Sequence, residues 1–233
     1  MRIVSVVALL LAYATVMGQS GIRLRKNDRK KDIILVTDSG TITLRLSDST
    51  PLHHDHFLSL VKQGYYDSIL FHRVINSFMI QGGDPDSKRA KPGEKLGNGG
   101  PSYTIPAEFR TTLFHRKGVL AAARQGDLAN PQKASSGSQF YIVQGKKFTP
   151  AGLDSVETYR LKGRKIPAEQ RVVYQTLGGS PHLDQQYTIF GEVVMGLEVV
   201  DKIAGTLTDP ENRPLTDIRI TKAKLVKRKR TAQ

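Results

Sequence analysis

Cysteine is absent from the 233 residues of the chain, and long apolar runs are scarce. Without cysteine, the chain cannot form a disulfide, a thiolate nucleophile, a thiolate zinc site or a lipid-modified N-terminal cysteine. The apolar run near the start, Ile3 to Met17, is shorter than the roughly 20 residues that cross a bilayer. Any catalytic chemistry must therefore come from residues other than cysteine. The apolar run is too short to be an obvious transmembrane segment.

Residues 1–18 have the composition of a secretory signal peptide. Arg2 gives the positively charged N-terminal region, the apolar run follows it, and Gly18 is a small residue suited to the cleavage site. We expect cleavage after Gly18 and a periplasmic or secreted protein without stable membrane insertion. Retention of this segment as an N-terminal anchor is the alternative, and it would change attachment but not chemistry.

Acidic residues are also in the minority, with 21 against 35 basic residues and a formal net charge of +14. Basic residues crowd a linker, 19–31, and the C-terminal end, where residues 227–233 form a basic tail. Such runs can bind nucleic acid or anionic surfaces. Neither run is interleaved with aromatic stacking residues, so we expect solvated flanks and no nucleic-acid partner.

The segment between these flanks, 32–226, is long enough for one domain with a single core. Two β-branched runs in 32–46, separated by Asp38, Ser39 and Gly40, predict a hairpin. Pro51 begins a predicted helix that runs to about Gln63. Further strands are predicted at 71–75, 78–83, 118–122, 139–144, 187–193 and 215–226. A long loop, 82–101, and a charged insertion, 146–181, interrupt this spacing, and one short helix after Pro167 is expected within the insertion.

Three ordered blocks resemble the cyclophilin family of peptidyl-prolyl cis/trans isomerases. The first runs from Phe71 to Pro85 (FHRVINSFMIQGGDP), the second from Ser136 to Ile142 (SGSQFYI), and the third from His182 to Gly191 (HLDQQYTIFG). The resemblance covers about 32–226 and is typical of a bacterial, exported member. It implies a mainly β fold, a closed eight-stranded antiparallel β-barrel capped by two helices, with the short extra helix in the insertion.

The reaction that the resemblance implies is rotation about Xaa-Pro bonds. Its barrier, about 18–20 kcal/mol, comes from resonance between the nitrogen and the carbonyl. A permanently charged donor aimed at the prolyl nitrogen or at the rotating carbonyl would favour the twisted state. Arg73 is the predicted catalytic residue, because a guanidinium stays protonated and presents several donors. No cofactor, metal or general base is needed, so His72 is interpreted as structural.

The resemblance also implies the substrate-binding residues. Phe78, Met79, Tyr141 and Leu183 would line the proline pocket, Gln81 and Gln139 would bind the substrate backbone, and Ala123 and Arg124 would lie along the groove. Gln139 and Tyr141 are two apart and so point the same way on a strand. His182 and Tyr187 complete the predicted site, whose partners would be proline-containing unfolded or flexible polypeptides bound by a monomer.

Four of these positions depart from the better-known family pattern. Tyr141 replaces the usual phenylalanine, Arg124 a common asparagine, Tyr187 a frequent histidine, and His182 a tryptophan of some members. These departures bear on substrate preference more than on catalysis. We expect weak binding of the cyclic peptide inhibitor cyclosporin, since His182 lacks the indole N–H and its larger surface.

Other functions remain open from the sequence. The same groove could serve a proline-peptide binding module or a holdase chaperone without significant turnover, or the insertion and basic tails could form an interaction scaffold. A metal site at His53, His54, Asp55 and His56 is disfavoured because polar residues are expected on the outer face of this helix. A phosphate loop at Gly97–Gly100 lacks its lysine, and Ser138 lacks the second glycine of a nucleophile elbow.

Overall fold

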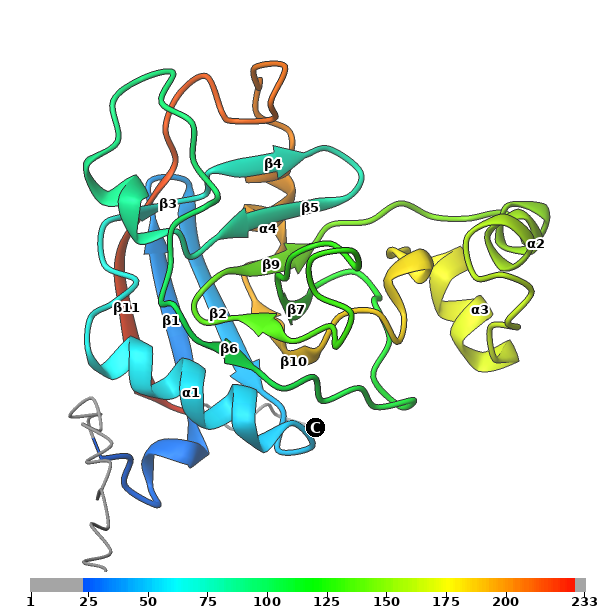
Figure 1. Ribbon diagram of the computed structural model, residues 1–233, viewed down its shortest axis with the longest axis horizontal. Helices are drawn as coiled ribbons and strands as arrows, with labels where there is room; N and C mark the ends of the chain where they lie inside the picture. The colour runs from blue at the N-terminus through cyan, green and yellow to red at the C-terminus, as the bar shows by residue number, and fades with distance from the viewer. Residues whose placement is uncertain (1–22, 229–233) are drawn as a thin grey trace, which may run out of the picture.

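The computed structural model describes residues 23–228, so the predicted signal peptide lies outside the described residues, as does most of the basic tail. The strands are β1 (Lys31–Thr37), β2 (Gly40–Leu46), β3 (Ile69–Leu70), β4 (Arg73–Ile75), β5 (Met79–Gly82), β6 (Thr104–Ile105), β7 (Val119–Ala122), β8 (Ser135–Ser136), β9 (Phe140–Val143), β10 (Ile189–Met195) and β11 (Arg219–Lys227). Nine of them form one antiparallel sheet in the order β3-β11-β1-β2-β10-β7-β9-β5-β4, and β6 pairs with β8. Figure 1 shows this large sheet curling around the interior.

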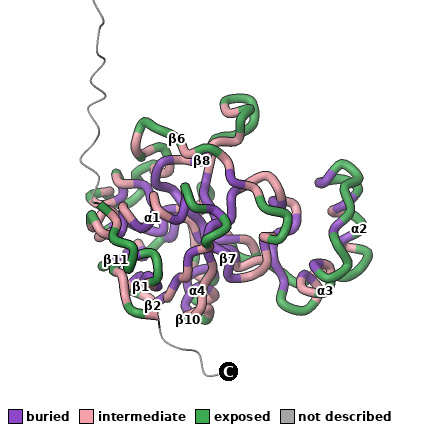
Figure 2. The backbone as a smooth tube through the Cα atoms, turned by 90° about the horizontal axis from the view of Figure 1, so that it is seen from below, coloured by how far each residue is buried: buried purple, intermediate pink, exposed green. Residues whose placement is uncertain are grey.

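The described residues contain four α-helices and three short 3-10 turns. The helices are α1 (Pro51–Lys62), α2 (Pro150–Tyr159), α3 (Ala168–Thr176) and α4 (Leu197–Ala204), and the turns are Asp28–Lys30, Pro85–Arg89 and Pro181–Leu183. Helix α1 packs on β11 and β10, whereas α4 packs on β2, β4 and β5. Helices α2 and α3 contact each other and project away from the sheet (Figures 1 and 2). No helix within residues 23–228 is long and apolar enough to cross a membrane.

The predicted closed eight-stranded barrel is wrong, because the sheet has nine strands and stays open. The additional strand is β3, which pairs with β11, while β4 pairs with β5 at the other end of the sheet. Only Phe71 and His72 separate β3 from β4, and both side chains are buried. The two ends of the sheet are thus joined by the covalent chain instead of by a ladder of hydrogen bonds.

The predicted hairpin and first helix are confirmed. Thr37 bridges the hairpin turn, since its hydroxyl donates to the carbonyl of Gly40 at 2.7 Å and accepts from the backbone N–H of Ser39 at 3.1 Å. Helix α1 begins at Pro51, whose missing N–H costs nothing at that position. It ends before Gly64, which adopts a left-handed φ of 67°.

The sheet separates two apolar clusters, and strand β9 serves both. Phe140 and Ile142 face the main core, while Tyr141 and Val143 join a second cluster on the opposite face. This alternation follows from the two-residue period of a strand. The second cluster also contains Met79, Val119, Ala121, Ala123, Leu183 and Ile189. Strand β9 is therefore buried on both faces, and Tyr141 on its outer face lines the groove described below.

The insertion forms two helices, so the expectation of one helix there is wrong. Helix α3 follows Pro167 as predicted, but α2 precedes it, with Pro150 in its first turn and the Thr149 hydroxyl accepting from the N–H of Gly152 at 3.1 Å. The missed signal is this Thr-Pro start. The two helices enclose a small core made of Leu153, Leu161, Ile166 and Tyr174.

The described part of the basic linker packs on α1 and is only partly solvated. The carboxylate of Asp28 accepts from Lys62 at 2.8 Å and from Lys31 at 3.1 Å. The Lys62 hydrogen bond is the largest of the interactions that hold the pKa of Asp28 well below its usual range. Arg29 pairs with Asp55 of α1. The linker therefore contributes to the folded unit, although Arg25, Lys26 and Lys30 are exposed.

Candidate active site

A groove of about 660 Å³ lies over strand β9 and contains most of the predicted site. Nine of the eleven predicted residues line it, namely Arg73, Phe78, Met79, Gln81, Ala123, Arg124, Tyr141, Leu183 and Tyr187. Gln139 accepts a hydrogen bond from Gln81, and His182 packs on Phe78 beside the groove. The structure thus brings the predicted residues together from four separate stretches of the chain, 73–81, 123–124, 139–141 and 182–187.

The antiparallel pairing of β4 with β5 positions Arg73. The register places Arg73 opposite Gln81 and Ile75 opposite Met79. The turn between these strands is tight, with Ser77 at a φ of 61° and its N–H donating to the side-chain oxygen of Gln144 at 2.6 Å. Because this turn is anchored, the short strand β4 that carries Arg73 is held in place.

Three polar side chains form a directed chain of hydrogen bonds along the groove. Arg73 Nη1 donates to Gln81 Oε1 at 3.3 Å, and Gln81 Nε2 donates to Gln139 Oε1 at 3.1 Å. Gln139 Nε2 then donates to the carbonyls of Gly97 and Gly99, both at 2.9 Å. Gln139 therefore holds the neighbouring loop, a contact that the sequence did not predict, while Gln81 orients the guanidinium.

The loop that covers this end of the groove is held by the buried carboxylate of Asp84. Its oxygens accept from the N–H groups of Gly97 at 2.5 Å, Gly99 at 3.3 Å and Asp86 at 2.9 Å. These bonds occupy the amides that a bound phosphate would need, so the structure does not favour the phosphate-loop alternative. The glycine-rich segment instead forms a wall of the groove.

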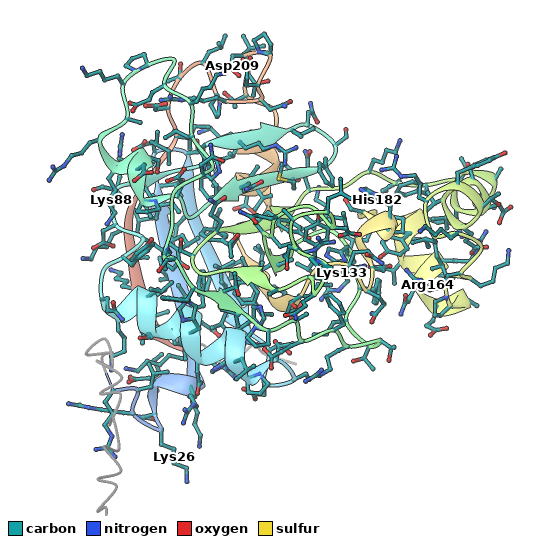
Figure 3. The ribbon with its side chains drawn as sticks, in the orientation of Figure 1. Lys26, Lys88, Lys133, Arg164, His182 and Asp209 are labelled. Carbon is teal, nitrogen blue, oxygen red and sulfur yellow. The ribbon has the colours of Figure 1, made fainter. Side chains whose placement is uncertain are left out.

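Several groove residues were missed by the sequence reasoning. They are His72, the loop residues Gly93–Asn98, and Asp209, Glu211 and Arg213 before β11. Arg213 is buried, and it donates to the carbonyl of Glu94 at 2.5 Å and to Asp217 at 2.9 Å. Figure 3 shows Asp209 on the loop at one end of the molecule and His182 near the insertion. Local sequence signals could not connect these segments, because they meet only in the folded chain.

The apolar part of the groove is formed by aromatic and aliphatic side chains. Tyr141 meets the ring of Tyr187 edge-on at a centroid distance of 5.8 Å. The guanidinium of Arg124 lies 4.5 Å from the centre of the Tyr187 ring and pairs with Asp127 at 2.7 Å. Phe78 and Met79 complete the wall on the β4–β5 side. This part of the groove therefore presents apolar surface to a bound molecule, and Arg124 packs on the ring of Tyr187.

Two histidines beside the groove are neutral near pH 7. Burial lowers the pKa of His72 to about 4, and it also lowers the pKa of His182 to about 4. Within residues 23–228, neither ring nitrogen of His72 has a hydrogen-bond partner. His182 packs on Phe78 at a centroid distance of 5.5 Å. Beside these neutral histidines, Arg73 lies in the groove as a permanent cation close to the apolar side chains of Phe78, Met79 and Tyr141.

The histidines of α1 do not lie on its outer face, which corrects that expectation. His53 and His54 are buried. His53 lies between Glu108, 2.7 Å from Nδ1, and Ser135, 2.9 Å from Nε2. His56 Nε2 lies 2.6 Å from the carbonyl of Gly137. Each histidine thus has its own structural partners, and the described residues contain no group of three or more side chains placed to hold a metal ion.

The hydrolase alternative also finds no support in the geometry around Ser138. Its hydroxyl donates to the carbonyl of Gly83 at 2.8 Å and lies 3.3 Å from the hydroxyl of Tyr65. These are structural partners, since neither group is a base that could activate the serine.

Comparisons with known proteins were made for the whole chain. The family model described as "Cyclophilin type peptidyl-prolyl cis-trans isomerase/CLD" matches residues 33–225. A Staphylococcus saprophyticus protein named as a peptidyl-prolyl cis-trans isomerase is 35% identical over 204 residues, covering 86% of this chain and 94% of that protein. A Staphylococcus aureus protein of the same name is 36% identical over 187 residues, covering 80% and 87%.

A longer relative and two solved structures complete the comparison. A Streptococcus pyogenes protein named as a bifunctional phosphatase/peptidyl-prolyl cis-trans isomerase is 36% identical over 199 residues, which cover 83% of this chain but only 38% of that protein. A Cryptosporidium parvum cyclophilin-type isomerase has a TM-score of 0.63 at 24% identity, covering 85% of this chain and 99% of that chain. A second structure of that protein, in the presence of the dipeptide Ala-Pro, gives a TM-score of 0.58 at 24% identity and covers 82% and 96%. These two structures support the fold.

Proposed function

The chain belongs to the family of cyclophilin-type peptidyl-prolyl cis-trans isomerases, and we propose that it rotates Xaa-Pro bonds in the groove that contains Arg73. The observation that carries this proposal is the position of the guanidinium. Arg73 lines the same groove as the apolar side chains of Phe78, Met79, Tyr141 and Leu183. A proline ring held against these side chains would place its nitrogen within reach of a permanent cation.

The chemistry follows from the orientation of the guanidinium. One Nη1 hydrogen bond to Gln81 fixes Arg73, which leaves its other donors for a substrate. A donor near the prolyl nitrogen draws its lone pair out of amide resonance, and this lowers the barrier of about 18–20 kcal/mol. No proton is transferred in this step, in agreement with the neutral state of His72 and His182 beside the groove.

The decisive experiment replaces Arg73 with alanine and follows cis-to-trans conversion of a short Ala-Pro peptide. We expect R73A to reduce kcat/KM by about a hundredfold or more, the scale seen when an electrostatic donor is removed, while the peptide still binds the apolar pocket. Arg89 is exposed on another segment and provides a matched control, R89A, which should behave like the wild type. Binding without any turnover by the wild type would favour the binding-module or holdase alternative instead.

We further propose that the enzyme assists the folding of exported proteins. Residues 1–18 support this proposal, since they have the features of a secretory signal peptide. Uncatalysed prolyl isomerisation takes tens of seconds or longer at room temperature, and its catalysis needs no cofactor or nucleotide. The substrates would be unfolded or flexible proline-containing segments of proteins outside the cytoplasm.

A further inference from the structure

The base of the insertion rests on the backbone of His115, behind the proline pocket. Gly179 and Lys146 pair across the two ends of the insertion, with the N–H of Gly179 donating to Lys146 at 3.0 Å. The next N–H, that of Ser180, donates to the carbonyl of His115 at 2.7 Å. A Cβ atom on Gly179 would overlap that same carbonyl oxygen. The insertion and His115 are therefore in direct contact at a position that tolerates only glycine.

A buried hydrogen-bond network continues from the insertion to the pocket. The hydroxyl of Tyr174, on α3, donates to Asp184 Oδ2 at 2.7 Å. Asp184 Oδ1 accepts from the backbone N–H of His115 at 2.7 Å and lies 2.9 Å from its Nδ1. His115 Nε2 lies 3.0 Å from the hydroxyl of Tyr141, on the floor of the groove. The side chains of Tyr174, Asp184 and His115 thus connect the insertion to Tyr141, which would touch the substrate.

The direction of each hydrogen bond follows from the chemistry of the partners. Since the carboxylate of Asp184 can only accept, Nδ1 of His115 carries the proton, and Nε2 is left to accept from Tyr141. Burial raises the pKa of both Tyr141 and Tyr174, so the two hydroxyls stay protonated and can donate. Every polar group in the network is satisfied, which is the condition under which buried polar networks make a site rigid.

We propose that the insertion is a positioning element for the proline pocket, and that Tyr174, Asp184 and His115 together hold the ring of Tyr141 in place. The proposal rests on the proposed function, because it assigns a role within the same groove. The Tyr141 ring stacks on His115 with 12° between the ring planes and meets Tyr187 edge-on. A phenylalanine at position 141 would lack the hydroxyl on which this coupling depends.

The test compares Y174F, Y141F, the double variant Y141F/Y174F and the control Y159F. Each substitution removes one hydroxyl and keeps the ring, and Tyr159 is exposed on the same insertion. We expect Y174F and Y141F each to raise KM for an Ala-Pro peptide about threefold to tenfold, the scale of one hydrogen bond, with kcat changed less than about twofold. The double variant should be no worse than either single variant, and Y159F should match the wild type.

Other results would overturn the proposal. A merely structural role for Tyr174 would lower the thermal midpoint of Y174F and leave KM unchanged, and independent roles would make the two effects multiply in the double variant. If Y174F does not fold, a wild-type KM for Y141F alone is sufficient to reject the proposal.

A second measurement separates this inference from the proposed function. The dissociation constant of the Ala-Pro peptide, obtained by NMR titration of all variants, does not depend on turnover. A wild type that binds but does not isomerise would reject the proposed function. The pattern of dissociation constants across the variants would still decide whether the insertion positions Tyr141.

Discussion

The protonation states of His72 and His182 lead to a prediction about how kcat/KM depends on pH. Their pKa values are lowered by burial to about 4, so neither side chain changes charge between about pH 6 and pH 8 in the folded protein. Because the proposed step transfers no proton, kcat/KM should stay constant over this range. Measuring kcat/KM across this range tests the prediction, and a sigmoidal change with a midpoint near pH 6.5 would show that a histidine takes part in the reaction.

The same two histidines affect stability with a defined sign. Their folded pKa values lie below the ordinary value of 6.5, so the unfolded state binds protons first as the pH falls. The free energy of unfolding should therefore decrease from about pH 6.5 down to about pH 4 and receive no further contribution from these groups below that. The thermal midpoint, measured at several pH values over this window, should fall more steeply with decreasing pH for the wild type than for H182Q. An equal dependence of the two midpoints on pH would contradict the assignment for His182.

Gln139 is predicted to act through the loop that it holds. Replacing it with leucine removes the donor to Gly97 and Gly99 and the acceptor for Gln81. We expect Q139L to stay folded but to lose about ten- to hundredfold in kcat/KM, because a few hydrogen bonds of this strength are lost. The exposed Gln132 offers the control Q132L. Wild-type activity in Q139L would show that the loop needs no such tether.

At the scale of elements, the insertion is stabilised by one buried carboxylate. Burial by itself would raise the pKa of Glu157, but hydrogen bonds from Lys165, the N–H of Ile166 and Arg171 outweigh it and lower the pKa to about 2. A carboxylate with a depressed pKa stabilises the fold above its ordinary pKa of about 4.5, and this contribution disappears as the pH falls towards 2.

The corresponding variant is E157Q. We expect its thermal midpoint at pH 7 to be a few degrees below that of the wild type, with the difference shrinking as the pH is lowered from about 4.5 to about 2. Glu169 is exposed on the same insertion, and E169Q serves as the control. A difference that does not change with pH would indicate that packing, and not charge, accounts for the effect.

The elements also show where local signals suffice and where they fail. The hairpin turn at Asp38 and Ser39 and the start of α1 at Pro51 are local features, so the sequence predicted both. The start of α2 at Pro150 carries the same kind of signal and was missed. The separation of β3 from β4 had no local signal, because it depends on which distant strand each segment meets.

At the scale of the whole molecule, export is the property most open to test. We expect the protein isolated from its native host to be found outside the cytoplasm and to begin at Gln19, as cleavage after Gly18 would leave it. Cell fractionation followed by mass spectrometry of the N-terminal peptide checks both points. An N-terminal peptide that still contains Arg2, in the membrane fraction, would instead support the retained anchor.

The sequence by itself determined the family, the mainly β fold and nine of the residues that line the groove. It could do so because Arg73, Gln81 and Tyr141 lie in short blocks where neighbouring residues constrain one another. The tertiary structure decided how those residues are supported. Gln139 is hydrogen-bonded to Gly97, which lies 42 residues away in the sequence, and Asp184 contacts His115, which lies 69 residues away. Such contacts arise from the curling of the sheet and the path of the insertion, and neither periodicity nor local turn chemistry encodes them.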